Sequence, residues 1–90
     1  MKRVVITVLG VDRVGIIAAV TKVLAEQKIN VLSINQTILD GFFNMVLMGD
    51  MTDAELDMQT LQKQFTALGE SMGLDIRAQL ADVFYKMHRV

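Results

Sequence analysis

The chain has 90 residues, 52% of them hydrophobic, and nine lysines and arginines against ten acids give a formal net charge of -1. This length suits one domain with a single core, and the balanced charge argues against a nucleic-acid partner. Without cysteine there are no disulfides or thiolate metal sites, and no apolar run approaches the roughly 20 residues that span a bilayer, so we expect a cytoplasmic protein with no membrane partner.

The first predicted elements are a strand and a helix joined by a short turn. Residues 4–9 are almost all β-branched or aliphatic, which is typical of a central strand. From Gly15 apolar residues recur at steps of three and four and predict a helix that ends near Gln27 and Lys28. Its buried stripe consists of Ile16, Ala19, Val20, Val23 and Leu24.

A hairpin follows. Residues 31–39 and 42–51 flank Asp40-Gly41, a dipeptide that favours the positive φ angles of a two-residue turn. The register of such a turn predicts one apolar face, with Ile38 opposite Phe43, Gln36 opposite Met45 and Ile34 opposite Leu47. The other face is mixed and would suit a partner subunit. It carries Ser33, Asn35, Thr37 and Asn44 beside Phe42, Val46 and Met48.

The second half predicts a helix, a strand and a short terminal helix. Thr52-Asp53-Ala54-Glu55 matches a capping box ahead of an amphipathic helix. Residues 74–80 then alternate apolar and polar side chains, as a strand does. Asp82 is expected to cap a terminal helix whose Phe84 and Met87 dock onto the domain or its partner.

This order of elements predicts an α+β fold. Right-handed crossovers give a ferredoxin-like βαββαβ sandwich, with one four-stranded antiparallel sheet, two helices on one face and a short C-terminal helix. We expect residues 1–90 to form a single domain, with a core of about 3–81 and a C-terminal segment of 82–90. Because the other sheet face has no cover of its own, we expect a homodimer or a higher homo-oligomer.

The junction between the first strand and the first helix is suited to a small anion or zwitterion. The first N–H groups of a helix lack intrahelical partners and carry the positive end of its dipole. The turn Gly10-Val11-Asp12-Arg13-Val14-Gly15, the element order and the segment Lys28-Ile29-Asn30-Val31 resemble an ACT domain, the amino-acid-binding regulatory module of metabolic enzymes. The resemblance covers about residues 3–81. The chain is similar in particular to small bacterial and archaeal proteins made of a single ACT domain.

That resemblance implies an amino-acid ligand at a dimer interface, between the turn of one subunit and the second strand of its neighbour. It implies that Asp12 takes the ligand's ammonium group, that backbone N–H groups around residues 14–16 take its carboxylate, and that the amide of Asn30 contacts it. The sequence departs from the serine-binding pattern, which has histidine at position 10 and asparagine at position 12. The candidate binding residues are Gly10, Val11, Asp12, Arg13, Val14, Gly15, Ile16 and Asn30.

Each of these residues also has a purely structural interpretation. Asp12 suits a helix N-cap, and Asn30 suits a left-handed bend before the second strand. Arg13 suits a solvated surface charge, and Gly15 suits close packing of the helix on the sheet. His88 is the only histidine, so we expect neither a catalytic pair nor a metal site.

Three functions therefore stand at this point. We expect a small-molecule-sensing regulatory domain with no cofactor and no enzymatic activity, acting on a protein partner. An alternative is a ligand-free interaction module that uses the open sheet face and the tail at residues 84–89. The third is an acylphosphatase-like enzyme, because acylphosphatases have the same element order, with an arginine in the first turn and an asparagine on a strand. In this chain, however, Asp12 occupies the turn that binds phosphate in those enzymes and would repel it.

Overall fold

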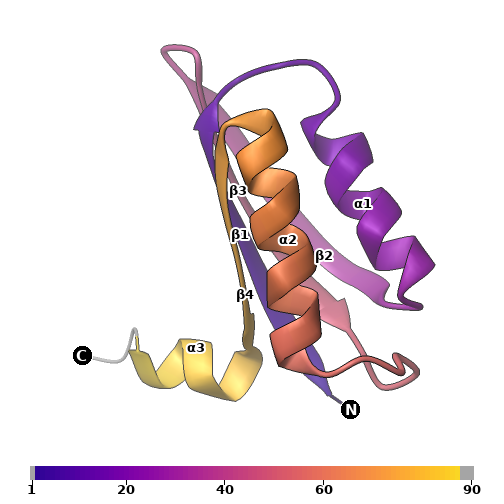
Figure 1. Ribbon diagram of the computed structural model, residues 1–90. Coiled ribbons are helices and arrows are strands. Elements are labelled where there is room, and N and C mark those ends of the chain that lie inside the picture. The colour runs from indigo at the N-terminus through magenta and orange to yellow at the C-terminus, as the bar shows by residue number, and fades with distance from the viewer. Residues whose placement is uncertain (1, 88–90) are drawn as a thin grey trace.

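The computed structural model describes residues 2–87. Its elements, in chain order, are β1 (Arg3–Val11), α1 (Ile16–Glu26), β2 (Asn30–Leu39), β3 (Phe42–Asp50), α2 (Met58–Met72), β4 (Leu74–Leu80) and α3 (Ala81–Met87). The strands form one antiparallel sheet in the order β2-β3-β1-β4 (Figure 1). This is the predicted ferredoxin-like sandwich. β1 begins one residue earlier and ends two later than the sequence indicated.

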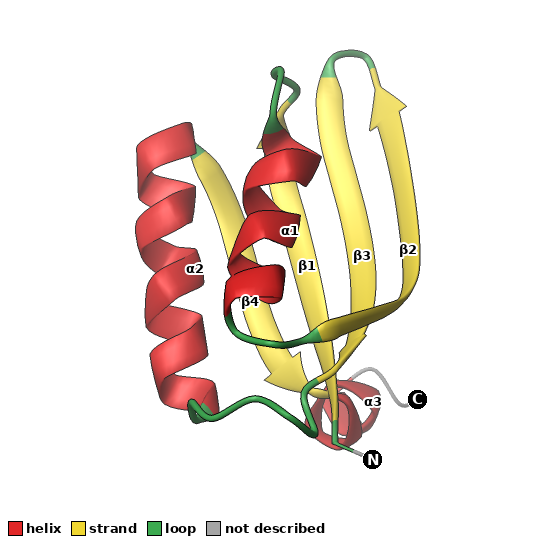
Figure 2. Cartoon of the chain, turned by 90° about the vertical axis from the view of Figure 1, so that its right-hand side faces the viewer, coloured by secondary structure: helices red, strands yellow, loops and turns green. Residues whose placement is uncertain are grey.

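The core lies between the sheet and the two long helices, which cover the same face (Figure 2). Alternate residues of the central strands β1 and β3 point into it, as do one stripe of each helix. Burying side chains of this size stabilises the fold by about 1.5–3 kcal/mol each. The largest fully buried side chains are Phe65, Ile6, Ile16, Leu24, Met45, Leu47, Met51, Leu61, Val4, Val8 and Val20.

The β2–β3 hairpin confirms the predicted register. Asp40 and Gly41 have φ angles of 52° and 79° and close the two-residue turn. Ile38 pairs with Phe43, Gln36 with Met45 and Ile34 with Leu47, as the turn requires. All ten residues of β2 are nevertheless exposed, because β2 is an edge strand that lies outside the helix layer in Figure 2.

The two edges of the sheet differ. At the β4 edge, Gln62 of α2 reaches the strand backbone: its Oε1 accepts from the Ala78 N–H at 2.6 Å and its Nε2 donates to the Ile76 carbonyl at 3.2 Å. These are groups that an added strand would use. Among the described residues no side chain is hydrogen-bonded to the β2 backbone in this way. The β4 edge is therefore blocked, and the β2 edge is open.

The predicted capping box is wrong. The Thr52 hydroxyl donates to Asp50 Oδ1 at 2.5 Å and accepts from the Lys2 N–H at 3.1 Å, so it caps no helix. α2 begins later, at Met58, and its N-cap is Asp57, whose side chain accepts from the Thr60 N–H at 2.8 Å. The predicted helix was correct, but its N-cap was placed five residues too early.

The open sheet face is not wholly bare, which corrects the expectation from the sequence. α3 follows β4 directly, so Asp82 lies inside its first turn and is not its cap. The helix projects from one end of the face, on the side opposite α1 and α2 (Figure 1). Phe84 is half-buried there, and Val5 is only 2% exposed on this face. The side chain of Met87 and all of His88 lie outside the described residues.

Among the described residues no helix is long and apolar enough to cross a membrane.

Candidate functional site

The predicted ligand turn is shorter than the sequence indicated. Gly10 and Val11 belong to β1, where they pair with Phe43 and Phe42. The remaining residues 12–15 form what we call the β1–α1 loop. The loop lies at the end of the sheet that also holds the β2–β3 hairpin, which we call the hairpin end (Figure 1).

Two contacts hold this loop in place. The Asp12 N–H donates to the Gly41 carbonyl of the hairpin at 2.8 Å. The Arg13 guanidinium donates through Nη1 to the Met72 carbonyl at 3.3 Å, at the C-terminus of α2, where the helix dipole favours a cation. Arg13 is thus exposed but anchored, which corrects its interpretation as a merely solvated charge. These two contacts tie the loop to the hairpin and to the C-terminus of α2.

Gly10 is required by a close approach between strands. A Cβ atom at this position would lie 2.5 Å from Leu74 Cδ2 and 3.2 Å from the Gly73 carbonyl oxygen. A side chain at position 10 would therefore force the Leu74 side chain to move and the Gly73 carbonyl to shift slightly. Gly10 thus allows β1 to pack closely against the start of β4.

Gly15 is required for a different reason. A Cβ atom here would meet no atom within 4 Å, so the predicted role in helix packing is wrong. Its φ of 91° lies in the left-handed region that side chains rarely adopt. This conformation turns the chain into α1, with Gly15 at the N-cap position.

The N-terminus of α1 has no side-chain cap and no acid in its first turn. The interpretation of Asp12 as a helix cap is therefore wrong. Asp12 is exposed, and no hydrogen bond or ion pair of its carboxylate is found within residues 2–87. A free carboxylate thus lies three residues from a set of free N–H groups. Together they match a zwitterion, because the acid attracts an ammonium and the helix terminus attracts a carboxylate.

The side chains around these groups are distributed unevenly. Val14 is 98% exposed and Val11 is 69% exposed, whereas Ile16 is 2% exposed and packs in the core. Ile16 can offer a ligand only its N–H group. Three cavities of about 500, 490 and 360 Å³ lie elsewhere on the described part of the chain, and none of the three is lined by residues 12–15.

Asn30 does not meet the loop within one chain. It pairs with Asp50, which pairs with Arg3 at the start of β1, whereas Gly10 near the loop pairs with Phe43. Asn30 is thus at the end of the sheet opposite the hairpin end. The left-handed residue before β2 is Lys28, with φ of 59°, so the interpretation of Asn30 as a left-handed bend is also wrong.

The titratable groups with perturbed pKa values lie away from the loop. Hydrogen bonds from the Thr52 hydroxyl and N–H lower the pKa of Asp50, and the hydrogen bond from the Thr60 N–H lowers the pKa of Asp57. Asp57 caps α2, and Asp50 accepts both hydrogen bonds within the turn that follows β3. Within the described residues no three acidic, histidine or cysteine side chains are grouped to hold a metal.

Sequence reasoning missed Gln62 and Asp57. Gln62 bonds backbone groups 14 and 16 residues away, which no local pattern reveals. Asp57 precedes the apolar periodicity of α2 directly, and that position was a usable signal for the N-cap.

The comparisons with known proteins agree with this architecture. The model of the ACT domain family matches residues 2–79. UPF0237 proteins from Methanocaldococcus jannaschii and Bifidobacterium longum are 44% and 43% identical over 90 residues, the full length of this chain and of each relative. An ACT domain protein from Streptococcus pneumoniae is 35% identical, with a TM-score of 0.81 over 92% of this chain and 93% of that one. A formyltetrahydrofolate deformylase from Pseudomonas syringae shares the fold, with a TM-score of 0.82 at 23% identity over 28% of its own length.

Proposed function

Because this chain belongs to the ACT domain family, we propose that it binds a small amino acid at the β1–α1 loop, at an interface between two copies, and signals by a change of association. One observation carries the proposal. The N-terminus of α1 is uncapped beside the free carboxylate of Asp12, and residues 2–87 supply no other partner for either. The ligand's carboxylate takes the N–H groups of Val14, Gly15 and Ile16, and its ammonium takes Asp12.

The open β2 edge supports the pairing of two copies. An exposed edge of ten residues that includes Ile34 and Ile38 is a template for another strand. Since Gln62 blocks the β4 edge, β2 is the edge through which two sheets join. A two-fold axis makes the two β2 strands antiparallel, so the start of one strand lies beside the end of the other.

This arrangement gives Asn30 a role that one chain cannot give it. Asn30 starts β2, and the loop lies near the other end of that strand. Antiparallel pairing of two β2 strands carries the second copy's Asn30 toward the first copy's loop. The site is then completed by the neighbour, and binding of the ligand is coupled to pairing.

The proposal assigns the chain a regulatory role, acting on a protein partner, and no catalytic one. The loop offers one carboxylate and backbone N–H groups, without a base and nucleophile within hydrogen-bond reach of each other. A pair of groups of this kind binds and orients a zwitterion. The effect of ligand binding is then a change in the assembly state of the protein rather than the formation of a product.

A melting screen tests this function. Wild type, Asp12→Ala and the control Asp40→Asn are heated with each of the twenty amino acids at millimolar concentration. Asp40 is an acid at the same end of the sheet, and asparagine tolerates its φ of 52°. A ligand at a hundredfold excess over Kd stabilises the folded state by about 2.7 kcal/mol, which raises Tm by roughly 10 °C or more.

The variants then assign the site. Loss of a charge-assisted hydrogen bond, about 1.5–3 kcal/mol, weakens binding to Asp12→Ala by roughly ten- to a hundredfold, whereas Asp40→Asn keeps the wild-type shift. If no amino acid raises the Tm of wild type, the sensor function is refuted and the ligand-free interaction module is the better account. If one amino acid raises the Tm of wild type and of Asp12→Ala equally, Asp12 does not bind the ligand.

A further inference from the structure

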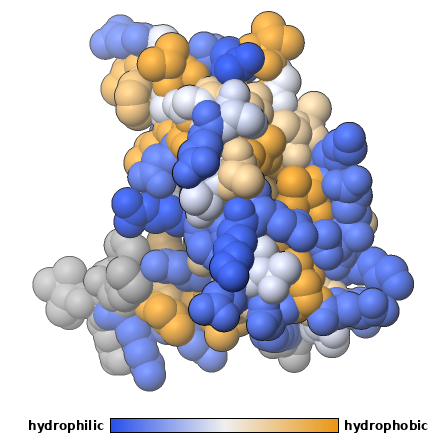
Figure 3. Space-filling model, in the orientation of Figure 1, coloured by the Kyte–Doolittle hydropathy of each residue, from blue (hydrophilic) through white to orange (hydrophobic). Residues whose placement is uncertain are grey.

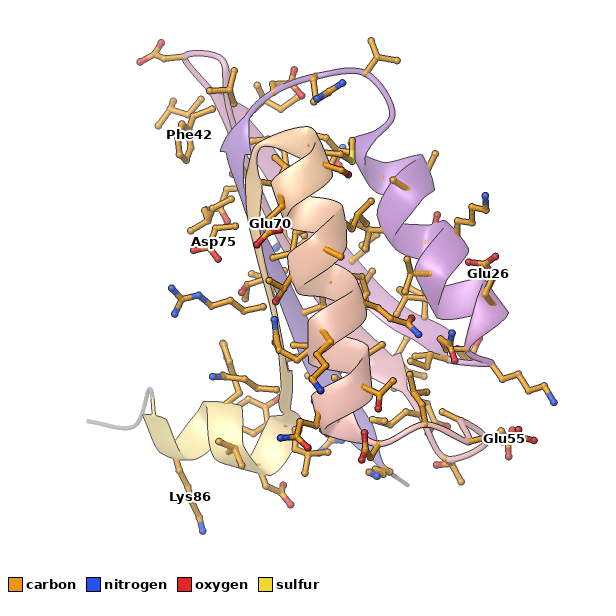
Figure 4. All side chains as sticks on the ribbon, viewed as in Figure 1. Glu26, Phe42, Glu55, Glu70, Asp75 and Lys86 are labelled. Carbon is orange, nitrogen blue, oxygen red and sulfur yellow. The ribbon has the colours of Figure 1, made fainter. Side chains whose placement is uncertain are left out.

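The open sheet face holds a cavity of about 490 Å³ between the sheet and α3. Its floor consists of side chains of β1, β3 and β4 that alternate with the core residues of these strands. Leu9 of β1 pairs with Asn44 of β3 on one side and with Asp75 of β4 on the other, and Thr7 pairs with Arg77. Asp75 points to the same side of the sheet as α3 (Figure 4). The volume lies within the range of about 300–1,000 Å³ that small-molecule sites occupy.

Most of the lining is polar. The apolar part consists of Val5 and Leu9 in the floor and Phe84 of α3, and the other side chains carry hydroxyl, amide or charged groups. In Figure 3 hydrophilic residues lie along the left margin, between the hydrophobic hairpin end and α3. A smaller cavity of about 220 Å³ continues the same face toward β2 and is lined by Asn35, Thr37, Asn44 and Val46. Since Asn44 belongs to both cavities, the polar surface is continuous, which suits a ligand that makes several hydrogen bonds.

The charged groups of the larger cavity form one pair. Arg77 Nε donates to Asp75 Oδ1 at 3.3 Å, and the two side chains are 70% and 53% exposed. Within residues 2–87 neither side chain has another hydrogen bond or ion pair. The N–H groups on both Nη atoms and the second carboxylate oxygen are therefore left for a ligand. Donors and an acceptor thus lie side by side on β4.

This pair favours a ligand without net charge. An anion bound to Arg77 would be repelled by Asp75, and a cation bound to Asp75 would be repelled by Arg77. A zwitterion would match the pair but would leave the uncharged groups of Asn44 and Thr7 unused. A hydroxyl group both donates and accepts, so two adjacent hydroxyls match the pair, and further hydroxyls match an amide. A carboxylate is also the group that binds ribose hydroxyls in dinucleotide sites.

We propose that this cavity binds a neutral ligand with two adjacent hydroxyl groups, the chemistry shared by monosaccharides and by the ribose of nucleosides. One hydroxyl donates to Asp75 Oδ2, and its neighbour accepts from the Nη groups of Arg77. Another polar group of the ligand bonds the Asn44 amide. The apolar side of the ligand lies against Leu9 and Phe84, which supply contact area without a competing polar group.

This site is separate from the β1–α1 loop. None of residues 12–15 lines the cavity, and the loop lies at the hairpin end. Pairing of two copies through their β2 edges would extend the sheet in its own plane and leave the open face uncovered. The ligand proposed here and the amino acid proposed above therefore bind at different surfaces, and each site can be removed without the other.

Titration of the full chain, followed by amide chemical shifts in NMR spectra, tests the proposal. The probes are ribose, glucose, adenosine and uridine at millimolar concentration. Deoxyadenosine and deoxyuridine are the matched controls, because they lack one of the two adjacent hydroxyls. Arg77→Met and Asp75→Ala each remove one member of the pair. Asp53→Ala removes an exposed acid in the loop between β3 and α2 and is the control variant. Melting curves verify that each variant folds.

We expect at least one diol to shift the amide signals of residues 75–79 and of Asn44. Arg77→Met and Asp75→Ala should weaken this binding by roughly ten- to a hundredfold, whereas Asp53→Ala should keep the wild-type affinity. The deoxynucleosides should bind roughly tenfold more weakly or worse. Binding of the nucleosides alone would identify ribose as the source of the diol, and equal binding of free sugars would show that the base contributes nothing.

Three results would overturn the proposal. They are the absence of shifts with every diol, equal affinity for a nucleoside and its deoxy analogue, and stronger shifts of the same signals by sodium acetate. Asp12→Ala separates this test from that of the proposed function. Because Asp12 lies outside the cavity, this variant should bind the diol as wild type does, even if no amino acid binds the loop.

Discussion

Gly15→Ala is the change whose effect can be worked out most directly from the structure. A new Cβ at this position meets no atom within 4 Å, so the substitution creates no clash. The φ of 91° must nevertheless be kept, because it turns the loop into α1. A side chain in the left-handed region costs about 1–2 kcal/mol, more than the alanine gains by restricting the unfolded chain. For a domain of this size Tm falls by roughly 4–8 °C for each kcal/mol.

Reversible thermal unfolding, followed by circular dichroism, measures this loss. Gly15→Asn is the matched control, since asparagine tolerates left-handed geometry and should lose less than half as much. Equal losses in both variants would show that the side chain, rather than the backbone angle, is responsible. An unchanged Tm in Gly15→Ala would refute the conformational explanation altogether.

Three further predictions concern the supports of the sheet. Gln62→Leu leaves two backbone groups of β4 without partners and should lower the free energy of unfolding by about 1–3 kcal/mol in urea titrations, whereas Gln59→Leu on the exposed side of α2 should change it little. The pKa of Asp57 is lowered in the folded state, so the ionised side chain stabilises the fold above the unfolded pKa, and this stabilisation is lost as pH falls through the folded pKa. Asp57→Asn should keep the cap and flatten the dependence of Tm on pH in this acidic range. Removal of residues 83–90 takes away the half-buried Phe84, which lines the same cavity as Val5, and should lower Tm without unfolding the sandwich. An unchanged Tm and mass would show that the segment stabilises nothing.

Local sequence signals predicted the elements of this fold well. Asp40-Gly41 fixed the hairpin and its register, because a two-residue turn determines every pair that follows it. Helical periodicity located α1 and α2 for the same reason, since one buried stripe decides the face. These signals act over a few residues, and their outcome depends little on the rest of the chain.

Predictions failed where a residue matched a local motif but other residues took its expected role. Thr52 matches a capping box locally, but its hydroxyl is engaged by Asp50 and by the Lys2 N–H, and α2 begins later. Asp12 is likewise a residue type that often caps helices. The left-handed Gly15 occupies the N-cap position of α1 instead, so the Asp12 side chain caps nothing. The direction of α3 depends on how β4 ends, which periodicity does not encode.

The position of the β1–α1 loop could be predicted from the sequence, but the position of Asn30 relative to it could not. The sequence placed the loop before α1 correctly, because a strand followed by a helix leaves few alternatives. It gave no means to see that Asn30 lies at the opposite end of the same sheet, or that Gln62 closes one edge. Both facts depend on the topology of the sheet, and both bear on how a second copy would approach.

The coupling between ligand and assembly is the central claim, and sedimentation with and without amino acids tests it most directly. The full chain is diluted through its dissociation range in buffer and in a millimolar mixture of the twenty amino acids. If the ligand bridges the loop of one copy and Asn30 of the next, the mixture should lower the dissociation constant of the β2 pair by about 5- to 150-fold, and Asp12→Ala should abolish that change. An identical dissociation constant in both buffers would contradict the account.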